Sequence, residues 1–200
     1  RPRPPSLPSA QLGLRLVFTG GNLAGERVRV RFAHPRLEVP ESLVPVSDTA
    51  NEITVDLPAA DDPSAQDKWA AGLYAVRAIV KGGDTERESN VLPLAFAPRI
   101  VKIEPISPIP RVNGDATLTL TCSPRVWPKQ SVDLLLAGRR VRAEAHDAPT
   151  DTLTFVVKDA PVVEDVFVRL RVDGVESMPF VRVADPPYVV FDDNQKVSIS

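Results

Sequence analysis

The stretch LYAVRAIV at residues 73–80 decides the fold, because it is apolar at nearly every position and is followed by a Gly82-Gly83 turn signal. A run of this length is typical of a strand at the centre of a sheet. A related run, VFVRLRVD, lies at 166–173. It leads into Asp173-Gly174, a strong hairpin signal because a type I′ turn needs positive φ at both central residues. The two stretches predict a matching central strand in each half of the chain.

Other segments of the two halves correspond as well. ITVDLP at 53–58 matches LTFVVKDAP at 153–161, and ESNVLPLAF at 88–96 matches ESMPFVRV at 176–183. A repeat of about 90–100 residues has the size of an immunoglobulin-like domain. Further runs alternate apolar and polar residues, which predicts strands with one buried and one wet face; they lie at 12–19, 27–32, 117–122 and 132–136. We therefore predict an all-β protein made of two tandem immunoglobulin-like β-sandwich domains.

Proline marks the expected boundaries, since 21 Pro against 10 Gly indicate short strands joined by stiff loops. We expect Phe180 to Val183 to close the second sandwich, and Gln66 to Ala71 to form the one short helical turn. The Pro- and Arg-rich start and the lack of an initial Met predict that the chain continues a longer protein. The expected divisions are a linker at 1–9, sandwiches at 10–97 and 98–185, and a C-terminal strand or tail at 186–200.

The composition argues against several classes of protein. Acidic and basic residues nearly balance, with a net charge of −2, whereas a nucleic-acid binder should show a concentrated basic face. Arginines alternate with apolar residues along the predicted strands, so we interpret them as solvated strand faces and not as a phosphate-binding patch. A single cysteine excludes a disulfide framework. No apolar run approaches the roughly 20 residues that span a bilayer, and no signal peptide is visible.

The candidate chemical groups favour packing over catalysis. His34 and His146 lie in different repeats without a ligand set for zinc, so we expect loop or surface histidines. Cys122 shares the inward phase of its strand with leucines, which predicts a core residue. Asp192-Asp193-Asn194 is interpreted as an Asx-type turn, with calcium binding as the alternative. We therefore expect no enzyme activity, no cofactor and no metal.

The two tryptophans have two possible roles. Trp69 and Trp127 can plug the ends of the sandwiches, which we favour. Exposed, they could instead stack on a sugar or anchor a protein interface.

Both repeats resemble the IPT/TIG type of immunoglobulin-like domain. RIVKIEPISP and GDATLTLT at 99–108 and 114–121 are similar to its opening, and GLYAVRAIV and ESNVLPLAF at 72–80 and 88–96 to its closing half. The terminal PPYVVFDDNQKVSIS at 186–200 resembles the end of the cap, or tail-terminator, proteins of bacterial contractile injection systems. In that family a segment of the form F-D-x-x-Q-x-V-x-I follows a Pro pair.

The cap resemblance implies a non-catalytic structural module without a cofactor. Its partners would be subunits of its own assembly: a ring, sixfold in the family, built by an N-terminal α/β domain that this sequence lacks, and the tube and sheath ends. It implies assembly in the bacterial cytoplasm into a particle that stays there or is released. Neither nucleic acid nor a membrane span is expected. The predicted partner interface comprises Tyr188, Phe191, Asp192, Gln195, Val197, Ile199 and Trp127.

The segment after Pro187 has two interpretations, which the sequence leaves open. It is either an extra edge strand of the second sandwich or a strand that adds to a neighbouring subunit. An alternative function also stays open: a cell-surface or carbohydrate-binding module, or such a module appended to a secreted glycan-processing enzyme.

Overall fold

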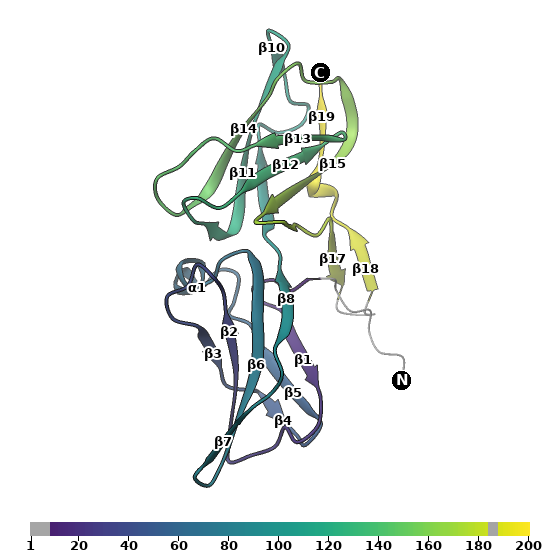
Figure 1. The fold of residues 1–200 in the computed structure, drawn as a ribbon. Coiled ribbons are helices and arrows are strands. Elements are labelled where there is room, and N and C mark those ends of the chain that lie inside the picture. The colour runs from purple at the N-terminus through teal and green to yellow at the C-terminus, as the bar shows by residue number, and fades with distance from the viewer. Residues whose placement is uncertain (1–8, 184–187) are drawn as a thin grey trace. The chain divides into compact units, whose positions relative to one another are not determined.

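The computed structural model describes residues 9–183 and 188–200, and the regular secondary structure of this part consists of strands and two short helices (Figure 1). The chain divides into two compact units, Ser9–Phe96 and Ala97–Ser200. The division lies one residue before the expected one. Each unit is a sandwich of antiparallel sheets, which confirms the predicted fold class. Of the predicted linker 1–9, all but Ser9 lies outside the described residues.

The first unit contains a three-stranded and a five-stranded sheet. The smaller has the order β1-β5-β4, with β1 at Arg15–Thr19, β5 at Glu52–Asp56 and β4 at Ser47–Asp48. The larger has the order β3-β2-β6, with β3 at Glu41–Leu43, β2 at Arg27–Ala33 and β6 at Gly72–Gly82. Both β7 (Thr85–Glu88) and β8 (Leu92–Phe96) pair with the free side of β6. The predicted central strand therefore has partners on both sides.

The core of the first unit is built around a buried tyrosine. The Tyr74 hydroxyl accepts from the backbone N–H of Ala70 and donates to its carbonyl, both at 3.0 Å. This is the tyrosine corner of immunoglobulin-like sandwiches, which ties the start of a central strand to the segment before it. Trp69 is 1% exposed and stacks on Phe96 at 5.3 Å between ring centroids. Trp69 therefore packs inside the sandwich, as favoured from the sequence.

The short helix lies earlier than expected. It spans α1 at Pro63–Lys68, not Gln66–Ala71, because Asp62 caps it and accepts a hydrogen bond from the Ser64 N–H at 2.9 Å. Proline suits the first helical position, since its missing N–H would have no helical partner. The helix ends at Lys68 because Trp69 turns extended to enter the core.

The second unit repeats this plan. In one sheet β11 (Asp115–Val126) pairs with β14 (Thr150–Val157) on one side and with β9 (Arg99–Glu104) and β10 (Arg111–Val112) on the other. The second sheet has the order β13-β12-β15-β16, at Arg139–Arg142, Val132–Leu136, Val163–Val172 and Val175–Glu176. The predicted Asp173-Gly174 turn joins β15 to β16 with φ of 45° and 86°, as a type I′ turn requires.

The strand that closes the second sandwich is not the one expected. It is β19, Lys196–Ile199, which pairs with β15 from Val163 to Phe167. On its other side β19 meets Ile109 in a parallel bridge, and Val197 and Ile199 are 2% and 1% exposed. Phe180 to Val183 lies in a separate hairpin, so the expected second sandwich at 98–185 lacked its last strand. Both short segments carry apolar residues suited to a strand, and strand pairing shows which of them closes the sandwich.

Removing the Tyr74 hydroxyl should destabilise the first unit. In Tyr74→Phe the buried N–H and C=O of Ala70 lose their partner, which costs about 1–3 kcal/mol of unfolding free energy. Urea unfolding of the full chain measures it. Tyr188→Phe is the matched control, because Tyr188 is 46% exposed. Equal stability of the two variants would contradict this role for Tyr74.

Candidate functional site

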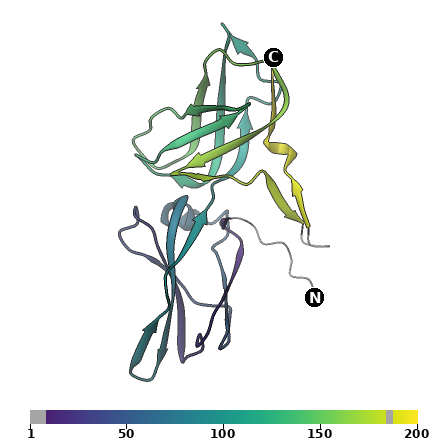
Figure 2. The same cartoon turned by 45° about the vertical axis from the view of Figure 1, so that its right-hand side comes forward.

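The feature that distinguishes the second unit from the first is a hairpin inserted before its last strand. Strands β17 (Phe180–Val183) and β18 (Tyr188–Phe191) pair only with each other and form a two-stranded sheet of their own. In Figures 1 and 2 this inserted hairpin extends from the sandwich of the second unit. An isolated two-stranded hairpin is at best marginally stable in water.

A serine marks the point of insertion. In the first unit, Ser89 donates its N–H to the Ala78 carbonyl, and its hydroxyl accepts from the Ala78 N–H, both at 2.9 Å. In the second unit Ser177 makes the same pair of bonds with Leu170, at 2.7 and 2.9 Å. Ser89 and Ser177 are thus structurally equivalent, as the sequence match of 88–89 with 176–177 predicted. After this point the first unit resumes pairing at Leu92, whereas the second resumes at Lys196.

The segment that returns to the sandwich is held by its own polar contacts. The Asp192 carboxylate accepts from the Asn194 N–H at 3.2 Å and from Gln195 Nε2 at 3.1 Å. Gln195, which is 3% exposed, also donates to the Met178 carbonyl at 3.1 Å. Asp193 pairs with Lys196 at 2.7 Å. These contacts support the Asx-turn interpretation of Asp192-Asp193-Asn194.

The predicted partner interface therefore has to be reduced. Val197 and Ile199 lie in the core, and the buried Gln195 side chain donates to the Met178 carbonyl. None of the three side chains is therefore accessible to a partner. Of the two interpretations left open for the segment after Pro187, pairing within the second sandwich holds for 196–199, since both edges of β19 have partners in its own unit. Tyr188 and Phe191 do remain accessible, at 46% and 66% exposed.

Apolar side chains occupy both faces of the inserted hairpin. Phe180 is the cross-strand partner of Phe191, and Val181 that of Val190, so successive pairs point to opposite faces. Phe191 contacts Phe167 at 5.3 Å between centroids and is otherwise open. A hairpin with one face on a core needs apolar residues on that face only. The second apolar face is surface that a partner can cover.

The remaining predicted residues fall elsewhere. Trp127 is half-buried in the turn after β11, and its Nε1 is buried without a hydrogen-bond partner among the described residues. Burial raises the pKa of Cys122 to about 12, which fits the predicted core role. His34 is in a loop as expected, but it is 7% exposed and lies against Tyr74, so it is not a surface histidine. His146 contacts the Ala148 carbonyl at 2.8 Å.

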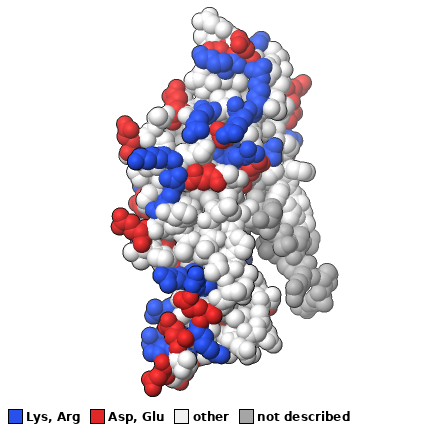
Figure 3. Space-filling model, viewed as in Figure 1, with Lys and Arg blue, Asp and Glu red and all other residues white. Residues whose placement is uncertain are grey.

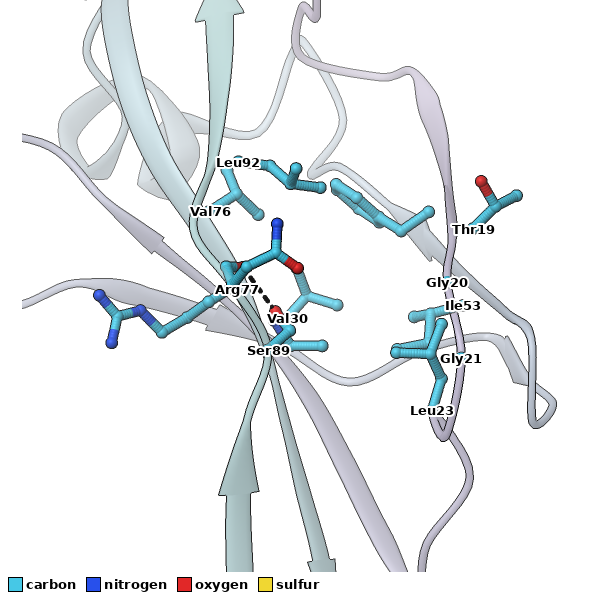
Figure 4. A pocket seen from close by; sticks show the side chains of 13 residues that line it. Thr19, Gly20, Gly21, Leu23, Val30, Ile53, Val76, Arg77, Ser89 and Leu92 are labelled. Carbon is cyan, nitrogen blue, oxygen red and sulfur yellow. Dashed lines mark hydrogen bonds between the residues drawn. The ribbon is translucent and has the colours of Figure 1, made fainter.

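A small apolar cavity of about 160 Å³ opens in the first unit where β7 gives way to β8 (Figure 4). Figure 4 shows Val30, Val76 and Ile53 around it and the Arg77 side chain directed away. Ligand pockets usually measure about 300–1,000 Å³ and carry converging polar groups. This cavity is too small and too apolar for such a ligand.

Between residues 9 and 183 and from 188 to 200, no three His, Cys, Asp or Glu side chains cluster as metal ligands would. Neither described helix has the length and apolar character needed to cross a membrane.

Comparison with known families assigns the second half of the chain. A family model described as "Domain of unknown function (DUF8756)" matches residues 98–197, half of the chain. The chain belongs to this family. The DUF8756 match begins at the boundary of the second unit, contains the inserted hairpin and ends within β19. The hairpin thus lies inside the extent of the family model. No curated protein sequence matches the chain.

Several solved structures are similar in part. At 12% identity the chain resembles the plexin A4 extracellular region, over 94% of this chain and 16% of that one, with a TM-score of 0.31. It resembles the titin I9–I11 tandem over 96% and 62%, with a TM-score of 0.27 and 12% identity. It also resembles SGBP-B of the Bacteroides ovatus mixed-linkage glucan utilization locus, which was solved in complex with a mixed-linkage heptasaccharide. This similarity covers 100% of this chain and 47% of that one, with a TM-score of 0.29 and 12% identity. The chain spans less than two thirds of each.

Shortening the closing strand and shortening the hairpin should have different effects. Ile199→Ala leaves a cavity at a fully buried site and should cost about 2–5 kcal/mol of unfolding free energy. Phe191→Ala, at a largely exposed site, should change it by less than about 0.5 kcal/mol. Denaturant unfolding of the full chain gives both values. A larger loss for Phe191→Ala would show that the hairpin, not β19, closes the sandwich.

Cys122 should be unreactive while the chain is folded. Its thiol is buried and protonated at about pH 8, and iodoacetamide needs an accessible thiolate. We expect alkylation, followed by mass spectrometry, to be at least about a hundredfold slower than in urea. Rapid stoichiometric alkylation of the folded chain would contradict a purely structural role.

Proposed function

We propose that the chain is a non-catalytic interaction module that uses the inserted hairpin to bind a protein subunit. The observation that carries this proposal is the position of an apolar hairpin outside both sheets of a complete sandwich. The sandwich does not need it, because the sandwich of the first unit resumes at Leu92 after Ser89 without an insertion. The hairpin therefore requires another explanation, and contact with a partner supplies one.

The chemistry of the hairpin suits a protein partner. Aromatic residues dominate the energetics of protein interfaces, and Phe191 and Tyr188 are exposed at the ends of β18. Phe167 packs against Phe191, and the Lys196 ammonium lies 5.1 Å from the Phe167 ring centroid. A supported aromatic side chain loses little rotamer freedom on binding, which favours affinity. Both backbone edges of the hairpin also remain available for strand addition within the described part of the chain.

The terminal sequence supports a more specific proposal. Its similarity to the cap proteins of contractile injection systems suggests that the module sits at the end of a phage-tail-like particle. The partners would then be neighbouring subunits of a ring, held together by an N-terminal domain, and the tube and sheath ends. Assembly would take place in the bacterial cytoplasm. Asp192, Gln195, Val197 and Ile199 would serve this role indirectly, by fixing the base of the hairpin.

The carbohydrate-binding alternative loses one of its two candidate residues. Trp69 is buried and cannot stack on a sugar, and Trp127 is half-buried.

Site-specific photocrosslinking in the native assembly tests the proposal. A photoreactive phenylalanine analogue at Phe191 should crosslink to a neighbouring protein, and the same analogue at Val112 should not. Val112 is a matched control because it is 69% exposed, close to the 66% of Phe191. Mass spectrometry of the product identifies the partner. A cap, tube or sheath subunit supports the specific proposal, and another protein leaves only the general one standing. Equal crosslinking at both positions would overturn both.

A further inference from the structure

The outer face of the larger sheet in the first unit carries an unusual row of cations. Arg27, Arg29 and Arg31 occupy alternate positions of β2, and Lys81 lies beside them on β6. With the residues around them they line a shallow groove of about 380 Å³, whose other lining residues are Val39, Pro40, Ser42, Ile79 and Glu86. We call this the arginine groove. The sequence predicted solvated strand faces here, but the sheet gathers these side chains into one concave site.

The arginine groove places like charges directly opposite each other. Arg27 is the cross-strand partner of Lys81, and Arg31 is that of Arg77. Such pairs destabilise a sheet. On the other side of β6, Glu86 of β7 lies opposite Lys81. The charge of Arg77 is compensated by an ion pair with Glu88. Among the described residues, Arg27, Arg29, Arg31 and Lys81 have no ion pair. The fold therefore tolerates an electrostatic cost that an anionic ligand would remove.

The second unit shows that this sandwich does not require the cost. Because Ser89 is equivalent to Ser177, Arg29 corresponds to Asp133, Lys81 to Asp173 and Arg27 to Ser131. The Asp173 carboxylate accepts from the Ser131 N–H at 2.8 Å, and Asp133 pairs with Arg140 at 2.9 Å. The same register thus carries compensated charges in one unit and uncompensated charges in the other.

Figure 3 shows basic side chains over β12, β13 and β15 of the second unit as well. Most of them have acceptors there. Arg169 and Arg171 both bind Glu176, and Arg139 donates to the carbonyls of Lys158 and Asp159. A count of surface cations alone would miss this difference between the units. Within the described residues the four cations of the arginine groove form no ion pair, although Glu86 lies across the strands from Lys81.

We propose that the arginine groove binds an extended acidic polypeptide segment with carboxylates on alternate residues. Alternate side chains on one strand are about 7 Å apart, so three guanidinium groups along β2 match the side chains of one face of an extended peptide. Guanidinium forks pair with carboxylates through two parallel hydrogen bonds. Val39, Pro40 and Ile79 supply apolar contacts between the charges, as at protein interfaces.

Other polyanions fit the arginine groove less well. Single-stranded nucleic acid is held by aromatic side chains on which bases stack, and no aromatic residue lines this groove. Glu86, which also lines the groove, would repel a continuous line of phosphates or sulfates, whereas a peptide can place an uncharged residue there. This proposal does not depend on the inserted hairpin, which lies in the other unit.

Fluorescence anisotropy with a labelled peptide of about ten residues, alternating Glu and Thr, tests the proposal on the full chain. We expect binding that weakens as NaCl rises from about 0.05 to 0.5 M. The double variant Arg29→Asp with Lys81→Asp introduces the residues of the second unit and should weaken binding by at least about tenfold. Arg87→Asp is the matched control, because Arg87 pairs with the inward-facing Val80 and lies on the opposite side of the sheet. It should change affinity by less than about twofold.

Three results would overturn the proposal: no binding of the alternating peptide, an equal loss in Arg87→Asp, or tighter binding of a single-stranded oligonucleotide or a sulfated oligosaccharide of the same charge. A peptide with the same composition but all Glu residues in one block should bind more weakly, and equal affinity would contradict the spacing argument.

The variant Arg27→Ser distinguishes an effect on binding from an effect on folding. It removes a like-charge pair, so affinity should fall while the Tm stays equal or rises. A fall in both would assign Arg27 a structural role.

Discussion

The second unit depends on the pairing of its last strand, β19, with β15 on one side and with the segment around Ile109 on the other. β19 pairs antiparallel with β15 on one side, and on the other the Ile109 N–H donates to the Ser198 carbonyl at 2.7 Å while Ser200 donates back to Ile109 at 3.1 Å. Ile109 and Ile199 are both at most 1% exposed. The first unit has the same device, in which Ala10 bridges Phe96 in parallel. Joining an early segment of each unit to its last strand closes the sandwich at the edge where water would otherwise enter.

Closure in this way explains how a hairpin can be inserted without loss of the sandwich. The chain leaves the sheet at Ser177 and re-enters at Lys196, and polar contacts secure both ends. Ser177 satisfies the backbone of Leu170 at the exit, and Gln195 satisfies the Met178 carbonyl near the entry. These contacts give the buried Leu170 N–H and the Met178 carbonyl hydrogen-bond partners, so the insertion leaves the core of the sandwich intact.

Charge, like strand pairing, distinguishes the two units at equivalent positions. Arg29 and Asp133 occupy the same register, and so do Lys81 and Asp173, yet only the second unit provides partners for them. The two units therefore offer chemically different surfaces on one scaffold. The inserted hairpin is apolar and the arginine groove is cationic, which is why we propose partners of different chemistry for them.

The sequence by itself determined the sandwich class, the repeat, the Asp173-Gly174 turn and the core role of Cys122, because strand periodicity and turn chemistry are local properties. Tertiary structure alone decided which segment closes the second unit, since Phe180 to Val183 and Lys196 to Ile199 are both short and rich in β-branched residues, and only their hydrogen-bonding partners assign their places. It also removed Gln195, Val197 and Ile199 from the predicted interface by burying them. The arginine groove needed the structure as well, because like charges become neighbours only when β2 and β6 align.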